Sequence, residues 1–348
     1  MSISYGGAQS YYAFITPVIE SKKIRTVRSE HVLQILASPG IKEALTKITN
    51  TDLGSYLNQN FHEGITTKEL EWCLWQFLAI ELQYLYRELP RRSREIVNQY
   101  ISKYDIMNLK TVLRRISFNT FEKPTGIPLG SIYLKGRLDD LLKCESKEEV
   151  GHLLDSVSMN KYAEIVRSGK ERIALETTLE AEYFSSLMKA TIRLGDRSTS
   201  HFVGTLLDMN NVLLIVRSII RKKKVTLLEL LPGSYRFSSR ELELCCRCDT
   251  LDEFLKALSK TCYFELAARL HDSHELDNDP ALIEIIVGQY VNSVAKEVFL
   301  SSIFTAGYFL AYILVKENEV RLLTTALKIV EERTPSDRYT EYLIGEKI

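Results

Sequence analysis

The sequence lacks an excess of either charge. Its 348 residues contain 45 Lys and Arg against 45 Asp and Glu, which gives a formal net charge of zero. Domains that bind nucleic acid usually carry a basic surplus, with basic clusters interleaved with aromatic residues. This chain shows neither feature, and we therefore expect no nucleic acid among its partners.

Turn residues and strand patterns are also scarce. Glycine and proline occur only 16 and 8 times, and no run alternates β-branched residues between two-residue glycine turns, as hairpin strands do. Apolar residues recur instead at helical spacing along nearly the whole chain. Because 45% of the residues are hydrophobic, which is ample for buried cores, the sequence predicts an all-α protein.

Signatures of catalysis and of metal binding are missing as well. The chain has no glycine-rich phosphate loop, no GxSxG and no HExxH, and its six histidines are scattered singly. We therefore expect no catalytic residues, no cofactor and no small-molecule substrate. Cys245, Cys246 and Cys248, with Cys262 further on, lack the two separated pairs that a structural zinc site prefers. We interpret them as buried or half-buried thiols rather than as a metal site.

What the chain does contain is an internal repeat. The segment Leu207–Lys224 (LDMNNVLLIVRSIIRKKK) has a counterpart in Tyr104–Arg115 (YDIMNLKTVLRR). Three polar residues recur at one offset, because 208 − 105, 211 − 108 and 217 − 114 all equal 103: Asp105, Asn108 and Arg114 match Asp208, Asn211 and Arg217. A third copy, Lys316–Leu327 (KENEVRLLTTAL), has Glu319 at the asparagine position and Thr325 at the arginine position.

Further anchors keep the same order in all three copies. A glutamate near the start of a long apolar pattern precedes the key position by 108 − 71 = 37, 211 − 176 = 35 and 319 − 284 = 35 residues. Before it comes a short amphipathic pattern, with matching pairs at Val32 and Leu36, Val150 and Leu154, and Phe254 and Leu258. These spacings predict three repeats, at residues 1–122, 123–228 and 229–348. A unit of about a hundred residues is long enough to form a small bundle of about four or five helices.

Local signals place several helix ends. Thr66 and Glu69 form the pattern of a capping box and open a long helix that runs to about Leu89. Pro90 then ends or kinks the helix. A further helix over 93–102 is expected to lead into the Asp105 segment, and the basic run 221–224 is interpreted as a helix end.

The repeated polar positions admit two readings, which are compatible. Asp105 and Asp208 fit the N-cap of a helix, where a carboxylate accepts hydrogen bonds from exposed backbone amides. Alternatively, the repeated acids and amides, one helical turn apart, line a polar inner surface of a symmetric assembly. The candidate residues for this partner interface are Asp105, Asn108, Asp208, Asn211, Lys316 and Glu319.

One run is apolar enough to raise the question of a membrane span. Val298–Val315 has eighteen uncharged residues, which is the short limit for a spanning helix. Its counterparts in the first two repeats carry several charges and could not span. We therefore expect a fully buried core helix here and no spanning segment.

The three repeats and their segments resemble the C subunits of archaeal-type (A/V-type) ATP synthases, which are relatives of the d subunit of the vacuolar proton pump. The resemblance extends from about Ser29 to Val330. It is carried by YDIMNLKTVLRR, by LDMNNVLLIVRSIIRKK and by LAYILVKENEVRLLTTALKIV near the C-terminus. The last of these contains a tyrosine followed by a Lys-Glu-x-Glu-hydrophobic-Arg pattern.

The resemblance implies a funnel of three similar helical bundles around a pseudo-threefold axis. Such a protein is a non-catalytic part of the central stalk and belongs to the rotor. It lies on the cytoplasmic face of the membrane as a peripheral protein, between the rotor shaft, which consists of the D and F subunits, and the membrane proteolipid ring. It couples the two for ATP synthesis or hydrolysis linked to proton or sodium transport. The six candidate residues are then expected near the central axis.

A different class of function stays open on the sequence alone. The chain could be a free-standing α-helical scaffold that binds protein partners, as solenoid repeats do. Solenoids repeat every 20 to 50 residues or so, however, against just over a hundred here. An all-helical enzyme would instead need clustered perturbed residues, which sequence does not reveal.

Overall fold

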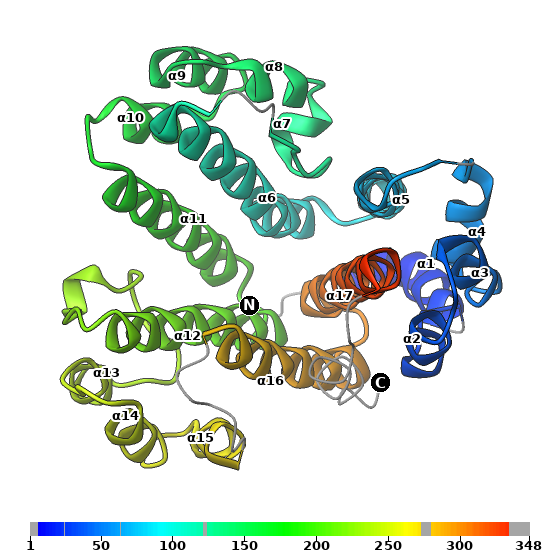
Figure 1. Cartoon of the computed structure of the whole chain (residues 1–348). Coiled ribbons are helices and arrows are strands. Elements are labelled where there is room, and N and C mark those ends of the chain that lie inside the picture. The colour runs from blue at the N-terminus through cyan, green and yellow to red at the C-terminus, as the bar shows by residue number, and fades with distance from the viewer. Residues whose placement is uncertain (1–5, 24, 63, 121–123, 273–279, 334–348) are drawn as a thin grey trace. The chain divides into compact units, whose positions relative to one another are not determined.

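Helices account for all regular secondary structure in the described part of the chain, as the sequence predicts. The computed structural model describes residues 6–23, 25–62, 64–120, 124–272 and 280–333 (Figure 1). The α-helices and their bounds are α1 (Gly6–Lys23), α2 (Ser29–Leu36), α3 (Ile41–Thr46), α4 (Asp52–Asn60), α5 (Thr67–Arg87), α6 (Arg91–Phe118), α7 (Ser131–Leu134), α8 (Leu138–Lys143), α9 (Lys147–Ser156), α10 (Asn160–Arg167), α11 (Arg172–Leu194), α12 (Arg197–Ile220), α13 (Ser239–Cys246), α14 (Leu251–Leu258), α15 (Phe264–Asp272), α16 (Pro280–Ser301) and α17 (Ala306–Glu332), with a 3₁₀ turn at Leu227–Glu229.

Short and long helices alternate in a recurring order. Three short helices, α2 to α4, precede the long pair α5 and α6, and α8 to α10 precede the long pair α11 and α12. The same order returns in α13 to α15 followed by α16 and α17. A turn of a few residues joins the two long helices of each pair.

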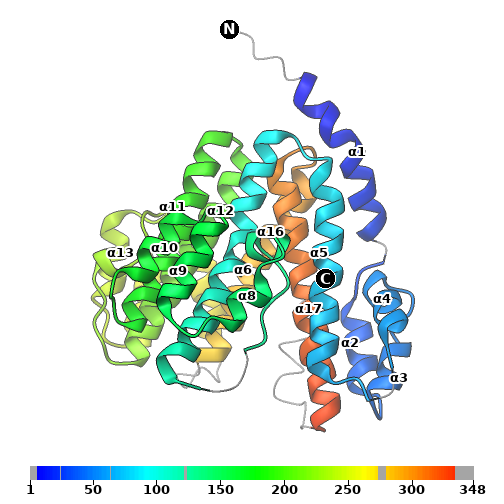
Figure 2. The ribbon, with the colours of Figure 1, turned by 90° about the horizontal axis from the view of Figure 1, so that it is seen from above.

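The chain divides into two compact units, which we describe separately. Unit 1 comprises residues 1–176 and 312–348, and unit 2 comprises residues 177–311. In unit 1, α17 runs alongside α5 (Figure 2), and the Lys328 ammonium of α17 lies 2.9 Å from the Glu71 carboxylate of α5. In unit 2, α12 packs against α16 and α14.

The predicted capping box at Thr66 and the helix end at Pro90 are confirmed, whereas the helix expected over 93–102 is part of the longer α6. The Thr66 hydroxyl accepts from the backbone N–H of Glu69, and the Glu69 carboxylate accepts from the backbone N–H of Thr66, so the capping box is complete. Pro90 separates α5, which ends at Arg87, from α6, which begins at Arg91. A proline is tolerated there because the first amides of a helix have no partner within the helix.

Apolar side chains at the predicted spacing form the core of each unit. In unit 1, Leu70, Leu74 and Leu78 of α5 are at most 1% exposed. In unit 2, Phe254 and Leu258 of α14 are fully buried. Of the matching residues, Val32, Val150 and Leu154 are also fully buried, as the shared amphipathic pattern predicts, and Leu36 is half-buried.

Two expectations about helix bounds are wrong. Asp105 and Asp208 lie inside α6 and α12 rather than at their N-termini, because each helix begins well upstream. The cap of α12 is Asp196, whose carboxylate accepts from the backbone N–H groups of Ser198 and Thr199. The carboxylates of Asp105 and Asp208 are therefore available for contacts outside their own helices.

The uncharged run 298–315 is also not one helix. It contains the end of α16 at Ser301, a turn, and the start of α17 at Ala306. Phe304 has a φ of 71° in that turn, a left-handed conformation that is uncommon for a bulky residue. The matched segments in the first two repeats contain the α5–α6 and α11–α12 turns. Among the described residues, α12 is the helix that is long and apolar enough to cross a membrane. Buried core helices of soluble proteins meet the same two criteria.

Candidate functional site: the repeat junctions

The repeated polar residues hold the chain at the points where one predicted repeat leads into the next. Asp105, inside α6, accepts from the backbone N–H of Ser131 (2.8 Å) and of Ile132 (2.9 Å), the first residues of α7. Its carboxylate thus caps a helix that begins 26 residues downstream. Gly130 allows the close approach: its φ is 97°, and a Cβ there would lie 2.4 Å from Asp105 Oδ1.

Asn108 lies one turn further along α6 and holds the preceding part of the linker. Its Oδ1 accepts from the backbone N–H of Ile127 (2.7 Å), and its Nδ2 donates to the Ile127 carbonyl (2.9 Å). An amide side chain can pair with a backbone unit in both directions, which a carboxylate cannot do. Asp105 and Asn108 together therefore fix both ends of the segment 127–132.

The second junction repeats this arrangement in unit 2. Asp208 of α12 accepts from the backbone N–H of Tyr235 and of Arg236, both at 2.8 Å, and from the Tyr263 hydroxyl at 2.5 Å. Asn211 accepts from the backbone N–H of Leu231 at 2.8 Å and donates to the Gly233 carbonyl at 3.3 Å. The amides bound by each aspartate lie four and five residues after the amide bound by its asparagine.

The third copy binds the start of the first repeat with different chemistry. Glu319 of α17 accepts from the backbone N–H of Val27 (3.4 Å), and Lys316 lies at the aspartate position. The Lys316 ammonium is 3.2 Å from the Glu319 carboxylate. Four and five residues after Val27, the N–H groups of His31 and Val32 already donate to the carbonyl of Arg28, the N-cap residue of α2. These two amides are thus already satisfied, and this explains why an aspartate is not needed here.

All six candidate residues predicted from the sequence are buried. Asp105, Asp208 and Asn211 are 0% exposed, Asn108 and Lys316 are 1% exposed, and Glu319 is 5% exposed. Each makes hydrogen bonds or an ion pair within its own unit. Their role at a partner interface stays a prediction, and their geometry gives them a role in holding the linkers.

A second set of contacts accompanies these junctions, and the sequence identified only part of it. The repeated spacing pointed to Glu71, Glu176 and Glu284, which pair with basic residues of the neighbouring long helices. Arg114 lies 2.6 Å from Glu176, and Arg217 lies 2.7 Å from Glu284. Thr325 cannot make the third pair, and Lys328, one turn later, pairs with Glu71 at 2.9 Å. The sequence could have indicated Lys328, because it lies three residues after Thr325 and therefore on the same face of the helix.

Burial affects the ionisation of two junction residues. It raises the pKa of the Asp105 carboxyl to about 7, although the N–H groups of Ile132 and Ser131 oppose the shift. It likewise raises the pKa of the Glu319 carboxyl to about 7 against the opposing charge of Lys316. Both shifts are the cost of placing a negative charge away from water.

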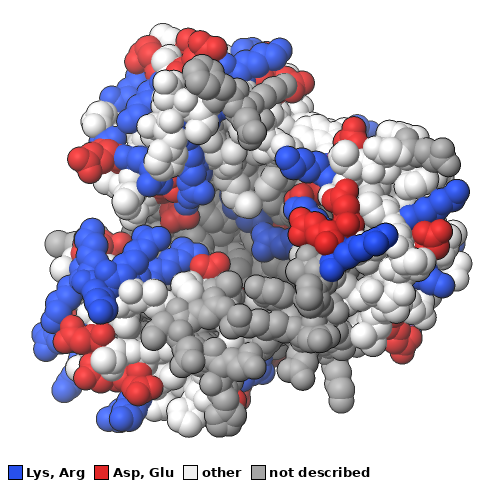
Figure 3. Space-filling view, viewed as in Figure 1, with Lys and Arg blue, Asp and Glu red and all other residues white. Residues whose placement is uncertain are grey.

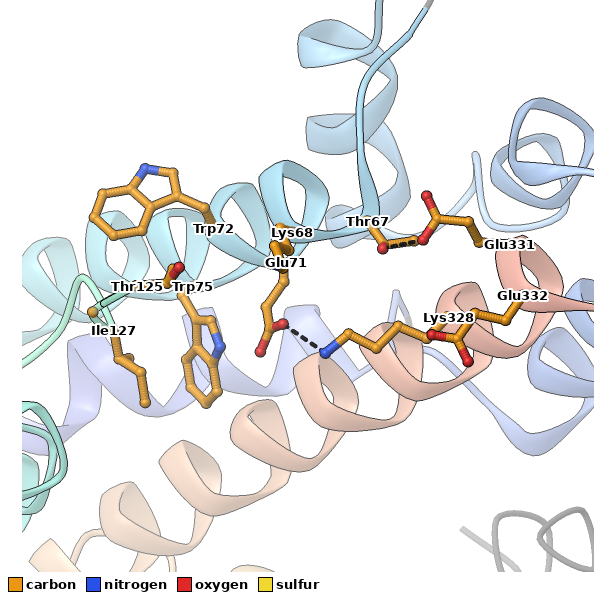
Figure 4. Close-up of a pocket in the computed structure, with 11 residues that line it drawn as sticks. Thr67, Lys68, Glu71, Trp72, Trp75, Thr125, Ile127, Lys328, Glu331 and Glu332 are labelled. Atoms are coloured by element: carbon orange, nitrogen blue, oxygen red, sulfur yellow. Dashed lines mark hydrogen bonds and ion pairs between the residues drawn. The ribbon is translucent and has the colours of Figure 1, made fainter. Parts of the chain in front are cut away.

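A surface pocket of about 330 Å³ in unit 1 lies between the first turns of α5, the last turns of α17 and the linker segment 125–127 (Figure 4). It contains both tryptophans of the chain, Trp72 and Trp75, on α5. Charged residues of α5 and α17 form the rest of its wall together with the linker segment 125–127, and the Glu71–Lys328 ion pair crosses it. Glu71 pairs with Lys328, and the Glu331 carboxylate accepts from the Thr67 hydroxyl. The pocket holds no arrangement of nucleophile and base.

The basic and cysteine clusters do not form a chemical site. Basic side chains gather over the C-terminal end of α12 and the segment that follows it (Figure 3), where the run 221–224 is exposed. Their place at a helix end matches the sequence interpretation. The cysteines are free thiols, and burial raises the pKa of Cys245 to about 12 and of Cys246 to about 11. Among the described residues, no group of three His, Cys, Asp or Glu is placed to hold a metal ion.

Comparison with known proteins identifies the architecture to which these junctions belong. Residues 15–342 match the ATP synthase (C/AC39) subunit family. The chain belongs to this family. Similar proteins include the C subunit of the A-type ATP synthase of Methanocaldococcus jannaschii, which is 24% identical over 96% of this chain and 86% of its own length. The corresponding A-type C subunits of Pyrococcus furiosus and Thermococcus kodakarensis are 23% and 21% identical, each over 96% of this chain and 90% of their own length.

Family membership agrees with the absence of catalytic motifs from the sequence. The C subunit of an ATP synthase is a non-catalytic accessory protein, so the chain is not an enzyme in its own right. Its partners are other subunits of an ATP synthase, a complex associated with a membrane.

Proposed function

We propose that the chain is a central-stalk component of the rotor in a rotary A/V-type ATPase. In this role it joins the soluble shaft, formed by the D and F subunits, to the proteolipid ring of the membrane. It thereby couples ATP synthesis or hydrolysis to the transport of protons or sodium ions. The match to the ATP synthase (C/AC39) subunit family carries this proposal. It extends from residue 15 to residue 342 and thus includes residues of both units.

The contacts at the junctions support a role in transmitting torque. Torque passes through a protein only if its elements do not yield, and packed helix bundles are stiff. Here the linkers between bundles are held as well: buried side chains fix the segments 127–132 and 231–236 by direct hydrogen bonds to their backbone. Segments that would otherwise act as hinges are thus attached to the long helices.

We further propose that the chain consists of three copies of one fold, at residues 1–122, 123–228 and 229–348. The recurring helix order supports this proposal. So do the equivalent bonds of Asn108, Asn211 and Glu319 to the backbone N–H of Ile127, Leu231 and Val27. We expect the six junction residues to affect partner binding through the segments they hold.

We also propose that the chain is a peripheral protein on the cytoplasmic face of the membrane. A peripheral rather than a membrane-spanning position is supported by the apolar helix α12, because the buried side chains of Asp208 and Asn211 project from it to the linker of its own unit. Such groups are costly on a helix that faces lipid.

Binding of the full chain to the two proposed partners tests the coupling role. Purified D–F shaft is immobilised, and the detergent-solubilised proteolipid ring is added with and without the full chain. We expect the ring to be retained on the shaft only when the chain is present. Failure of the chain to bind either partner would contradict the proposal. A soluble monomer that binds peptides instead would identify a free-standing scaffold.

A further inference from the structure

The Glu319 carboxylate at the third junction is poorly satisfied for a charged group. Its Oε2 accepts from Val27 N–H at 3.4 Å and from the Lys316 ammonium at 3.2 Å. Its Oε1 is buried and has no hydrogen-bond partner among the described residues. By contrast, both oxygens of Asp105 and of Asp208 accept from backbone N–H groups at 2.8 or 2.9 Å. A buried carboxylate with an unused oxygen is expected to be costly when it is charged.

A second carboxylate lies close enough to oppose the charge of Glu319. Glu81 of α5 is 5% exposed and raises the pKa of Glu319 through its negative charge. Glu81 Oε1 accepts from the Tyr312 hydroxyl of α17 and from the Lys22 ammonium of α1 at 2.9 Å. Its Oε2 is buried and, within the described chain, also has no partner.

Among the described residues, only two ammonium groups lie among the three carboxylates at this contact, and the third cation is a surface guanidinium. The ammonium groups of Lys316 and Lys22 face Glu319 and Glu81, and Asp52 of α4 lies 3.9 Å from Lys22. Two ammonium groups therefore meet three carboxylates. The guanidinium of Arg25 is 3.4 Å from Asp52, but its side chain is 67% exposed and it is screened by water. Glu317, further round α17, has its own partner in Lys103 at 2.6 Å.

We propose that the contact between α17 and the start of the first repeat is a proton-sensitive latch, in which α17 holds the backbone of Val27 tightly while Glu319 is protonated and loosens its hold when Glu319 becomes charged. The proton resides on Oε1, the oxygen without a partner, so that Oε2 continues to accept from Val27. When the latch opens, water reaches the charged carboxylate and separates it from Glu81. The inference does not depend on the proposed function, since it concerns contacts within unit 1 alone.

The direction of the effect follows from linkage. Burial raises the pKa of Glu319 from 4.5 to about 7 in the closed state. Opening returns the pKa toward the lower value, so the closed state binds the proton more tightly. The latch is therefore most stable below the lower pKa and loses stability as the pH rises through the higher one. One linked proton lowers the ratio of closed to open forms about tenfold between pH 6 and pH 8.

The other junctions provide an internal comparison. Leu231 N–H is held by the amide of Asn211, which does not titrate. Ile127 N–H is held in the same way by Asn108, but it lies close to Asp105, whose own pKa is raised. The second junction is therefore the better control.

Hydrogen exchange on the full chain between pH 5.5 and pH 8.5 tests the latch. After correction for the pH dependence of the intrinsic rates, we expect the protection of Val27 to fall about tenfold from pH 6 to pH 8. The protection of Leu231 should change less than twofold. Constant protection of Val27 over this range would overturn the proposal, and this outcome needs no variant.

Two variants assign the effect to Glu319. Glu319→Gln keeps the shape of the protonated side chain, and we expect it to hold Val27 at the high level of protection at every pH. Glu284→Gln removes a surface carboxylate that pairs with Arg217 in unit 2, and it should leave the response of Val27 as in the wild type. A Glu319→Gln protein that retains the wild-type pH response would also contradict the latch.

Discussion

Replacement of Asp208 by alanine should destabilise the protein strongly. The carboxylate is fully buried and accepts three hydrogen bonds, from two backbone N–H groups at 2.8 Å and from the Tyr263 hydroxyl at 2.5 Å. Hydrogen bonds to a charged group contribute about 1.5 to 3 kcal/mol each. Tyr235 and Arg236 are exposed, so water can partly replace the lost acceptor at their N–H groups. Tyr263 is 0% exposed, and its hydroxyl is left without that partner. We therefore expect a loss of about 3 to 5 kcal/mol, below the simple sum.

Urea unfolding followed by circular dichroism measures this loss. Hydrogen exchange at Tyr235 and Arg236 then shows whether the linker has been released. Asp252→Asn is the matched control, because Asp252 lies exposed in the first turn of α14 in the same unit. It should change the free energy of unfolding by less than about 1 kcal/mol. If Asp208→Ala costs no more than this control, or if the two amides keep their protection, the role assigned to Asp208 is wrong.

Three further predictions concern other parts of the chain. Gly130→Ala should lower the free energy of unfolding, measured in urea, by at least about 1 kcal/mol more than Gly136→Ala does. Both glycines have a positive φ, but only a Cβ at position 130 would clash with Asp105. Equal losses for the two variants would argue against the close approach of Asp105 to Gly130. Burial raises the pKa of Asp105 from 3.8 to about 7 and that of Glu319 from 4.5 to about 7, so the free energy of unfolding should decrease as the pH rises from 5 to 8, by about 5 kcal/mol for the two groups together; an increase would contradict the shifts. In the native protein, Cys245, which is 1% exposed, should react with a thiol reagent far more slowly than the half-buried Cys248, as mass spectrometry can measure; similar rates would contradict this burial.

Much of the helical architecture follows from local sequence signals. Thr66, Glu69 and Pro90 determine helix ends through contacts within a few residues, and the periodicity of α5 reports which face is buried. Such signals can be read from the sequence because both partners lie close together in it.

The polar junctions could be located from the sequence but not interpreted. The repeat identified Asp105 and Asp208, yet an aspartate before an apolar run looks the same whether it begins a helix or continues one. Their partners lie 26 to 55 residues away, and only the fold brings them together. The sequence also gives no sign of the turn at Phe304. It contains no glycine or proline, the residues that usually mark a turn.

The ion pair made by Lys328 in α17 shows a further limit of predicting contacts from aligned sequence positions. A strict alignment of the repeats places Thr325 at the arginine position, and no ion pair is then expected. The structure restores the pair through Lys328, because residues three apart lie on the same face of a helix.

Ion transport by the reassembled complex tests the central claim most directly. ATP hydrolysis and ATP-driven ion uptake are measured together in proteoliposomes that contain the rotary ATPase with or without this chain. The proposed coupling role predicts that complexes without the chain hydrolyse ATP but do not accumulate ions, and that addition of the full chain restores uptake. Undiminished uptake in the absence of the chain would contradict the account.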